Sequence, residues 1–159
     1  MTVPTHLLTV WNPSYADDAM DAHLRVLLRW AERRDRDEAE PDDVYVWWAK
    51  LRSPRREGDL PHVDDVLALN EQIAAEVETH LYLTDYRSLY VGYLIEIDSG
   101  DLLAEYPDEI EHMPAYYRGR EADFWFHLRD IRRLVDADTP GVIEELKKLR
   151  NRRYHDKPV

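Results

Sequence analysis

The stretch DVYVWWAKLRS, residues 43–53, places two adjacent tryptophans inside a run of β-branched and aromatic residues. Such a run predicts a β-strand, and Pro54 directly after it ends the pairing. Successive side chains of a strand point to opposite faces, so Trp47 and Trp48 must lie on different sides of the sheet. Any fold for this chain therefore has to accommodate a large indole ring on each face of this strand.

The two faces of this strand differ in composition. Tyr45, Trp47, Ala49 and Leu51 form an apolar set that suits a protein core, whereas the other face begins with valines, passes through Trp48 and ends in basic residues. We therefore expect Trp47 to be buried and Trp48 to line a pocket where the face becomes basic.

The length and composition indicate one folded domain over residues 1–159. Hydrophobic residues make up 44% and charged residues 34%, and only five glycines are present, which argues against disorder. The chain has no cysteine, which excludes disulfides and thiolate chemistry and favours a cytoplasmic location. No apolar run reaches the ~18 residues that span a bilayer, so a membrane role is not expected.

The charge distribution leaves two interpretations open. A net charge of −12 argues against a protein that coats nucleic acid indiscriminately, because Lys and Arg contacts to phosphate supply most non-specific affinity. Basic residues nevertheless concentrate in 50–56 and 147–157. They form either solvated faces of mixed charge or a local basic rim on an acidic body.

Hydrophobic periodicity predicts the remaining elements. We expect strands at 5–11, 43–53, 79–85, 89–98 and 122–128, and helices at 16–34 and 139–153, with a short helical piece at 129–135. Residues 61–78 are expected to form one helix or two short ones. Residues 99–121 are expected to form a long loop with a short helical turn. The fold class is α+β: a small mixed, curled, barrel-like sheet of about five or six strands with flanking helices.

Catalytic signatures are scarce. The sequence contains no glycine-rich phosphate loop, no HExxH and no G-x-S-x-G, and its seven histidines lack metal-ligand spacing. We therefore predict no catalytic residue, no metal and no cofactor.

The aromatic residues give the stronger signal. Ten tyrosines and five tryptophans accompany only two phenylalanines, a bias toward rings that carry a polar group. Strand alternation predicts that Leu89, Val91, Tyr93, Ile95 and Ile97 share the core face. It places four aromatic residues on the faces opposite the main apolar sets: Trp48, Tyr82, Tyr90 and Trp125. Three tyrosines lie in the adjoining loops: Tyr86, Tyr116 and Tyr117. These rings would line one concavity that stacks a flat base at about 1–3 kcal/mol per base. The alternative is that both sheet faces are covered.

Four segments resemble the PUA-like superfamily, to which the EVE and YTH domains belong. They are YVWWAKLRS at 45–53, THLYLTDYRSLYVGYLIEI at 79–97, HMPAYY at 112–117 and ADFWFHLRDIRRL at 122–134. EVE and YTH domains take up a modified base in an aromatic pocket without reacting with it. The resemblance implies that Trp48 is the cage tryptophan and that Met113, Tyr116 and Tyr117 supply a second wall.

The expected function is therefore a non-catalytic reader of a modified base in DNA, as the sensor module of a bacterial modification-dependent restriction or defence system. The expected pocket adds Tyr82, Tyr86, Tyr90 and Trp125, with Ser53 and Asp85 as polar contacts. Phosphates would be held by Lys50, Arg52, Arg55, Arg56, Arg118 and Arg120. The expected partners are a nucleic acid carrying the modified base and a nuclease or ATPase domain or protein. The alternative is a protein–protein adaptor whose exposed aromatics anchor an interface.

Overall fold

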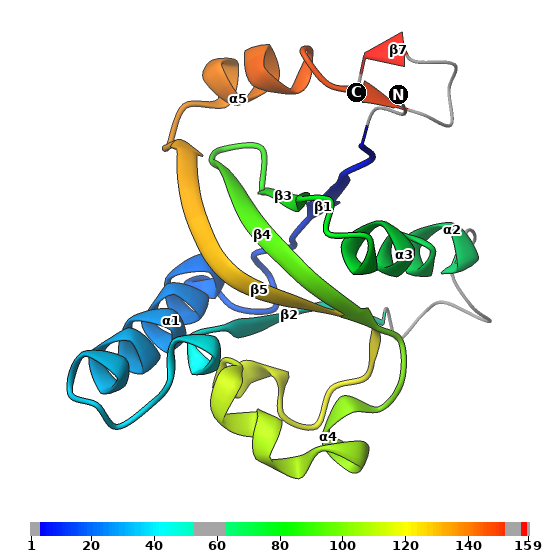
Figure 1. Ribbon diagram of the computed structural model, residues 1–159. Coiled ribbons are helices and arrows are strands. Elements are labelled where there is room, and N and C mark those ends of the chain that lie inside the picture. Colours follow the sequence, from blue (N-terminus) through cyan, green and yellow to red (C-terminus); the bar gives the residue numbers. More distant parts are fainter. Residues whose placement is uncertain (1–3, 53–62, 152–156, 159) are drawn as a thin grey trace.

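The computed structural model of the protein describes residues 4–52, 63–151 and 157–158, and its centre is one curled five-stranded sheet (Figure 1). The sheet strands are β1 (Leu7–Val10), β2 (Val46–Leu51), β3 (Thr79–Thr84), β4 (Leu89–Asp98) and β5 (Ala122–Val135). They are ordered β1-β3-β4-β5-β2; β1 runs parallel to β3, and the other neighbours are antiparallel. The predicted mixed sheet is confirmed, with β1 and β2 at its two edges.

The curled sheet forms a half-barrel, and helices flank it. The predicted α+β class is therefore confirmed. The α-helices are α1 (Ala19–Asp35), α2 (Val63–Leu67), α3 (Leu69–Ala74), α4 (Leu102–Glu105) and α5 (Thr139–Leu146). Short 3-10 helices are η1 (Pro41–Asp43), η2 (Pro107–His112) and η3 (Ala115–Tyr117), and β6 (Arg150–Asn151) pairs with β7 (Lys157–Pro158). The prediction of a C-terminal helix to residue 153 is wrong, because α5 ends at Leu146.

The longest strand, β5, differs most from the sequence prediction. Residues 129–135, expected to be helical, continue β5 along β4, where Arg132 pairs with Val91 and Val135 with Leu89. β5 thus pairs with both β4 and β2, and three irregularities interrupt its register with β4. Such bulges bend a strand and increase its twist. The bent β5 therefore gives the sheet its curl (Figure 1).

The main core lies between one sheet face, α1 and α3. Its buried members come from all three: Met20, Val26, Trp30, Val44, Val46, Trp48, Leu69, Leu81, Leu83, Leu94, Ile97, Phe124, Phe126, Leu128 and Ile131. Trp48 pairs with Phe126 across the β2–β5 ladder and is 2% exposed. The expectation that Trp48 lies opposite the main apolar sets is therefore wrong.

The face prediction for β4 is also corrected. Leu94 is buried, whereas Tyr93 is 36% exposed, so the expected face is inverted along this part of the strand. A register shift after Leu94 then returns Ile97 to the core. Gly92 faces the core as well, where a Cβ would stand 3.0 Å from the Leu128 methyl groups. The absence of a side chain at Gly92 thus admits Leu128 rather than a ligand.

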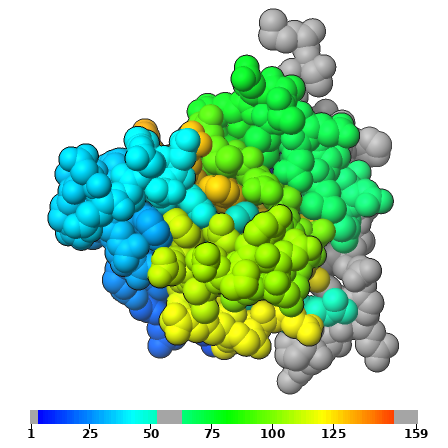
Figure 2. Space-filling view, turned by 60° about the horizontal axis from the view of Figure 1, so that its bottom comes forward, coloured from blue at the N-terminus to red at the C-terminus, as the bar shows by residue number. Residues whose placement is uncertain are grey.

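The opposite face of β2 and β5 is covered by the segment from α4 to η3. Trp47, Ala49 and Trp125 of the two strands pack there against buried residues of that segment: Leu102, Met113 and Tyr117. Figure 2 shows this segment, in yellow-green, as a layer beside the α1–η1 region. The burial predicted for Trp47, which is 3% exposed, is confirmed. At this end of the sheet both faces are covered, as the alternative interpretation held.

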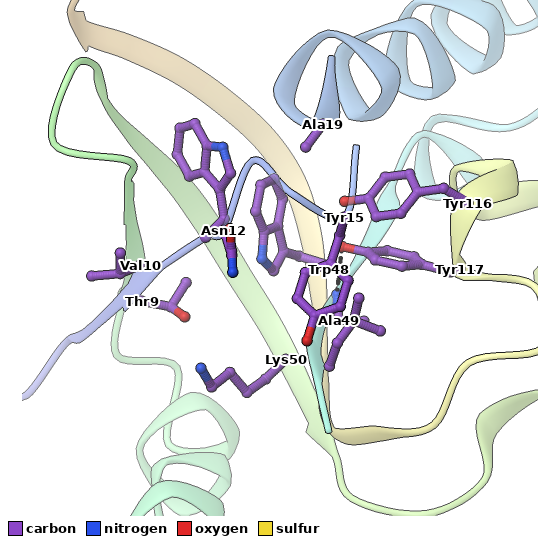
Figure 3. Close-up of a pocket in the computed structure, with 12 residues that line it drawn as sticks. Thr9, Val10, Asn12, Tyr15, Ala19, Trp48, Ala49, Lys50, Tyr116 and Tyr117 are labelled. Atoms are coloured by element: carbon purple, nitrogen blue, oxygen red, sulfur yellow. Dashed lines mark hydrogen bonds between the residues drawn. The ribbon is translucent and has the colours of Figure 1, made fainter. Parts of the chain in front are cut away.

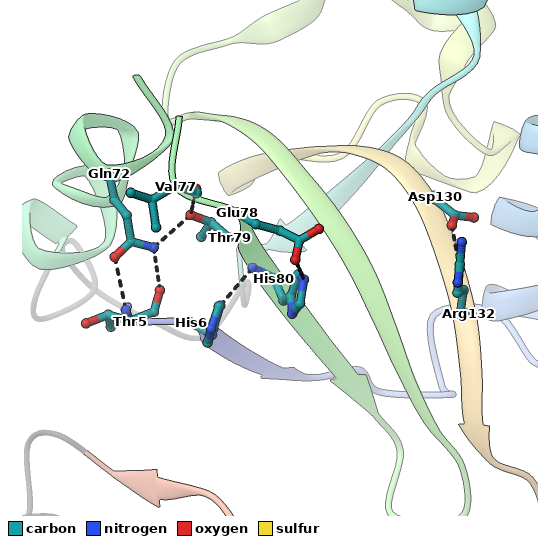
Figure 4. A network of polar contacts seen from close by, with 9 residues as sticks. All are labelled: Thr5, His6, Gln72, Val77, Glu78, Thr79, His80, Asp130 and Arg132. Atoms are coloured by element: carbon teal, nitrogen blue, oxygen red, sulfur yellow. Dashed lines mark hydrogen bonds and ion pairs between the residues drawn. The ribbon is translucent and has the colours of Figure 1, made fainter. Parts of the chain in front are cut away.

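A network of hydrogen bonds holds the edge strand β1 at its N-terminal end (Figure 4). The Thr5 amide donates to Gln72 Oε1 at 3.0 Å, and Gln72 Nε2 donates to the Thr5 carbonyl at 2.8 Å. The His80 amide donates to Nδ1 of His6, whose ring stacks on that of His80 at 4.9 Å. The start of β1 is thereby held against β3 and α3.

Glu109 anchors η2 to β2. Its carboxylate accepts hydrogen bonds from the Tyr45 hydroxyl and from Nε1 of Trp47, each at 2.7 Å. Next to it, the His112 ring lies between those of Trp30 and Tyr45, with centroids 4.1 and 3.8 Å away. A carboxylate and a stack of rings therefore hold the covering segment in place.

Replacing Glu109 should loosen this segment. Glu109→Ala leaves the half-buried Tyr45 hydroxyl and the buried Trp47 indole N–H without their charged acceptor, and hydrogen bonds to charged groups contribute about 1.5–3 kcal/mol each. We expect the free energy of unfolding in urea to fall by about 2 kcal/mol.

Glu105→Ala is the matched control, because the exposed Glu105 carboxylate makes no hydrogen bond or ion pair with the described residues. It should change stability by less than about 0.5 kcal/mol. Equal effects of the two substitutions would refute the anchoring role of Glu109.

Candidate functional site

A pocket lies between the two edge strands of the half-barrel (Figure 3). Its volume is about 260 Å³, and one wall comes from β1 and the turn after it, another from β2, and the rest from α1 and η3. The lining residues are Thr9, Val10, Trp11, Asn12, Tyr15, Ala19, Trp48, Ala49, Lys50, Leu51, Tyr116 and Tyr117. Because β1 and β2 are not paired with each other, the open side of the barrel forms the site.

Five of the lining residues are aromatic, but they differ in accessibility. Trp48 and Tyr117 are each 2% exposed, and the His23 ring covers one face of the Trp48 indole at 4.0 Å. Trp11 meets Trp48 edge-on at 5.6 Å and is half-buried, as are Tyr15 and Tyr116. The buried rings thus form the base of the pocket, and the half-buried rings are the surfaces that a ligand can reach.

The Tyr117 hydroxyl joins three elements beneath the pocket. His23 Nδ1 lies 2.7 Å from the Ala19 carbonyl, which only accepts, so Nδ1 carries the proton. Nε2 is then an acceptor, and the Tyr117 hydroxyl donates to it at 2.9 Å. The Ala49 amide donates to the same hydroxyl at 3.0 Å. This network ties the free edge of β2 to α1 and η3.

Both titratable members of the network are neutral. Burial lowers the pKa of His23 to about 3, and the hydrogen bond to Ala19 opposes this only in part. Burial likewise raises the pKa of Tyr117 well above its ordinary value. The base of the pocket therefore carries no charge at neutral pH.

The polar groups of the pocket lie nearer its mouth. Lys50 extends from β2 toward the side occupied by Thr9 (Figure 3), and it forms no ion pair with the described residues. Asn12 stands on the opposite wall, and its Oδ1 accepts a hydrogen bond from the Ser14 amide at 2.9 Å. The site thus combines an uncharged aromatic base with one cation and one amide.

The rim is held by Arg120. Its guanidinium lies 5.1 Å from the centre of the Tyr15 ring, and its Nε donates to the Tyr116 carbonyl at 2.9 Å. A cation over a tyrosine ring is attracted to the ring face. Arg120 therefore positions two of the accessible aromatic walls relative to each other.

Four of the residues expected at the site line this pocket: Trp48, Tyr116, Tyr117 and Lys50. Arg120 lies at its rim. Arg118 is exposed in the neighbouring turn, and the half-buried Arg52 continues the chain directly after β2. Ser53, Arg55 and Arg56 lie outside the described residues.

The other expected pocket residues lie elsewhere. Met113 and Trp125 are buried between the α4 to η3 segment and the sheet, and Tyr82 packs against the cluster of Leu89 and the α5 residues Val142 and Leu146. Tyr86 is 51% exposed at the turn between β3 and β4. Asp85 accepts hydrogen bonds from the amides of residues 87 and 88, so it stabilises that turn.

Tyr90 lies next to the pocket without lining it, with its ring 6.2 Å from that of Trp11. The single concavity expected for all of these rings does not form, because Trp48 and Tyr90 lie on the main core face of the sheet, whereas Trp125 and Tyr82 lie on the opposite face.

Sequence reasoning missed the wall formed by residues 9–15. Trp11 ends a predicted strand and Asn12 and Tyr15 follow it, where Asn-Pro marked only a turn. Their proximity to Trp48 depends on the strand order, which places β1 and β2 at opposite edges of a curled sheet. A rare tryptophan beside an Asn-Pro turn was the only local signal.

Two further observations bear on the kind of site. Within residues 4–52, 63–151 and 157–158, no group of three or more histidine or acidic side chains is arranged to hold a metal ion. In the same part of the chain, no helix combines the length and apolar character needed to cross a membrane.

Comparison with known proteins does not assign the chain to a family: no protein-family model, curated protein or solved structure matches it significantly. The class of protein therefore has to be argued from the half-barrel and its pocket.

The buried His23 predicts a pH dependence of stability. Since its pKa is about 3 in the folded state and near 6.5 in the unfolded chain, the unfolded chain binds the proton more readily as the pH falls. Stability is therefore lost below about pH 6.5, by up to about 1.4 kcal/mol per pH unit for this group. We expect His23 alone to lower the free energy of unfolding, measured in urea, by about 2 kcal/mol between pH 6.5 and pH 4.5.

His23→Gln supplies the comparison, because glutamine does not titrate. The variant should lose less stability than the wild type between pH 6.5 and 4.5. An NMR titration in which the His23 ring protonates near pH 6.5 in the folded protein would contradict the prediction.

The Tyr117 hydroxyl predicts a second effect. Tyr117→Phe leaves the Ala49 amide and His23 Nε2 without a partner in a buried position, which costs about 1–3 kcal/mol. Tyr15→Phe, at a half-exposed ring of the same pocket, should cost less than about 0.5 kcal/mol. Thermal or urea unfolding distinguishes the two, and equal stability of Tyr117→Phe and wild type would exclude the network as a stabilising element.

Proposed function

We propose that this protein is a non-catalytic reader of a modified nucleobase, built on a PUA-like half-barrel resembling the EVE and YTH domains. The observation that carries the proposal is the pocket between β1 and β2, which is lined by five aromatic residues and by Lys50. Flat bases stack on such rings, and a nearby cation attracts phosphate.

The size of the pocket supports a single ring system. At about 260 Å³ it lies just below the range of about 300–1,000 Å³ typical of drug-sized ligands. Its uncharged base, formed by Trp48, Tyr117 and His23, favours a neutral ring in the interior. A quaternary ammonium ligand also suits aromatic walls, but Lys50 would repel it.

The residue expected to stack the base changes with the structure. His23 covers one face of the Trp48 indole, and little of that side chain is exposed. The half-buried rings of Trp11, Tyr15 and Tyr116 are the accessible stacking surfaces. We assign the stacking role to these rings and the role of a rigid floor to Trp48.

Phosphate contacts would come from the basic residues around the mouth. Lys50 lines the pocket, Arg120 lies on its rim, and Arg118 is exposed nearby. Such a small basic rim on a chain with a net charge of −12 suits a reader that depends on the base more than on non-specific phosphate contacts.

The rival interpretation, a protein–protein adaptor, has weaker support. Its anchors would be the exposed aromatics; Tyr93 lies along β4, but Tyr86 lies at the turn between β3 and β4, whereas Tyr106 lies between α4 and η2. These last two places are at opposite ends of the molecule (Figure 1). An interface usually groups its aromatic anchors near its centre.

The wider role follows from the same resemblance. We propose that the domain works in the cytoplasm as the sensor module of a bacterial modification-dependent restriction or defence system. Cleavage would then be performed by a nuclease or ATPase domain or partner, which receives the signal that the modified base in DNA is bound.

Fluorescence anisotropy with labelled oligonucleotides tests the reader function. Single-stranded and duplex DNA that carry one modified base are compared with plain DNA at several salt concentrations. We expect preferential binding of at least one modified DNA, with affinity falling as salt rises. Tyr15→Leu should weaken this binding at least tenfold by removing one accessible wall.

The choice of variants matters. Trp48→Ala removes a core side chain, so its loss of binding would not separate pocket from fold. Tyr106→Leu, at a ring that is 58% exposed and outside the pocket, is the control and should bind as the wild type does. If modified and plain DNA bind equally poorly at low salt, the proposal fails.

A further inference from the structure

We infer that the pocket selects a ring whose polar edge presents hydrogen-bond acceptors, namely a nucleobase bearing carbonyl or carboxylate oxygens toward Asn12 and Lys50. This inference rests on the proposed function and deepens it, because it names the chemistry of the base that is read.

The orientation of the Asn12 amide carries the first step. The Ser14 amide donates a hydrogen bond to Oδ1 of Asn12 at 2.9 Å, closing a local turn. An N–H group can be accepted only by the oxygen, so this contact fixes which end of the amide is which. The Nδ2 amino group is thereby left to the pocket side, where it can only donate (Figure 3).

Lys50 carries the second step. Its ammonium group has three donors and no acceptor, and its half-buried side chain reaches from β2 toward the β1 wall (Figure 3). Lys50 on β2 and Asn12 in the turn after β1 therefore place hydrogen-bond donors on two different walls of the pocket. A ligand edge lying between the two walls meets donors from either side.

The remaining polar side chains do not offset this bias. Among the residues that the structure describes, no aspartate or glutamate lines the pocket. The Tyr117 hydroxyl already donates to His23 and accepts from Ala49. The hydroxyls of Thr9, Tyr15 and Tyr116 can both donate and accept, so they adapt to either kind of edge. The side chains with a fixed role are therefore donors.

This arrangement discriminates between bases. A carbonyl or carboxylate oxygen satisfies Asn12 Nδ2 and Lys50, whereas a base edge that presents only an exocyclic amino group would place donor against donor and leave both unpaired. A site built to hydrogen-bond one group strongly rejects an analogue that lacks that group. This discrimination is much larger than the discrimination of an apolar pocket against a ligand that lacks one methyl group. Carboxylates gain further from the charge of Lys50.

The test uses oligonucleotides of one sequence with a single variable central base: cytosine, 5-methylcytosine, uracil or 5-carboxylcytosine. In anisotropy titrations we expect uracil and 5-carboxylcytosine to bind at least tenfold more tightly than cytosine and 5-methylcytosine. Equal affinity for all four, with measurable binding, would overturn the inference.

Asn12→Asp is the sharpest variant. The aspartate oxygen still accepts from the Ser14 amide, so the turn is retained, while the amino donor becomes an acceptor. The preference for uracil over cytosine should fall at least tenfold. Lys50→Met keeps the length of the side chain and should selectively weaken 5-carboxylcytosine binding. Arg87→Gln, at the exposed turn between β3 and β4, makes the same change in net charge as either variant and should leave the preference intact.

The outcomes separate this inference from the proposed function. If Tyr15→Leu abolishes binding but Asn12→Asp leaves the ratio between uracil and cytosine unchanged, the pocket reads bases by shape and the inference is wrong. If none of the four oligonucleotides, and no other modified DNA, binds better than plain DNA, the proposed function itself fails.

Discussion

The hydroxyl group of Tyr117 is the contact on which the site depends. It accepts from the Ala49 amide on the free edge of β2 and donates to His23 of α1, while its ring packs in the layer formed by α4 to η3. A backbone donor on an edge strand would otherwise be buried without a partner, at a cost of about 1–3 kcal/mol. By satisfying it with a side chain rather than a sixth strand, the protein leaves the barrel open at the place where the pocket forms.

An open barrel gives the pocket walls of different kinds. The buried floor, with Trp48 stacked on a neutral His23, is rigid and uncharged, whereas the mouth carries Lys50, Asn12 and the half-buried rings. Ring stacking provides affinity for any flat ligand, and the fixed donors provide selection among them. In the proposed reader, these two tasks would fall to different parts of the pocket.

The sequence predicted the strands and α1 well, because their apolar periodicity is strong and local. The prediction from the sequence failed where pairing between strands outweighs the local pattern of apolar residues. RDIRRLV at 129–135 has the composition of a short helix, but β4 offers it a complete ladder, and β5 continues. A register shift also breaks the alternation of β4, so Leu94 rather than Tyr93 reaches the core. The expected grouping of Tyr82 and Trp125 with Trp48 does not form, because those two rings lie on the sheet face opposite Trp48. A bulge leaves no signal in side-chain alternation, which assumes an unbroken strand.

For the tryptophan pair, the sequence alone determined that the two rings point to opposite faces, because alternation is a property of any strand. It also supplied Lys50, Tyr116 and Tyr117 as candidates for one site. Only the tertiary structure decided that both indoles are buried, since each face has its own cover, from α1 on one side and from α4 to η3 on the other. Only the strand order brought Trp11, Asn12 and Tyr15 to the same pocket. The physical reason is that a pocket between two edge strands is defined by how far the sheet curls, and curl is set by bulges and long-range pairing rather than by any local run of residues.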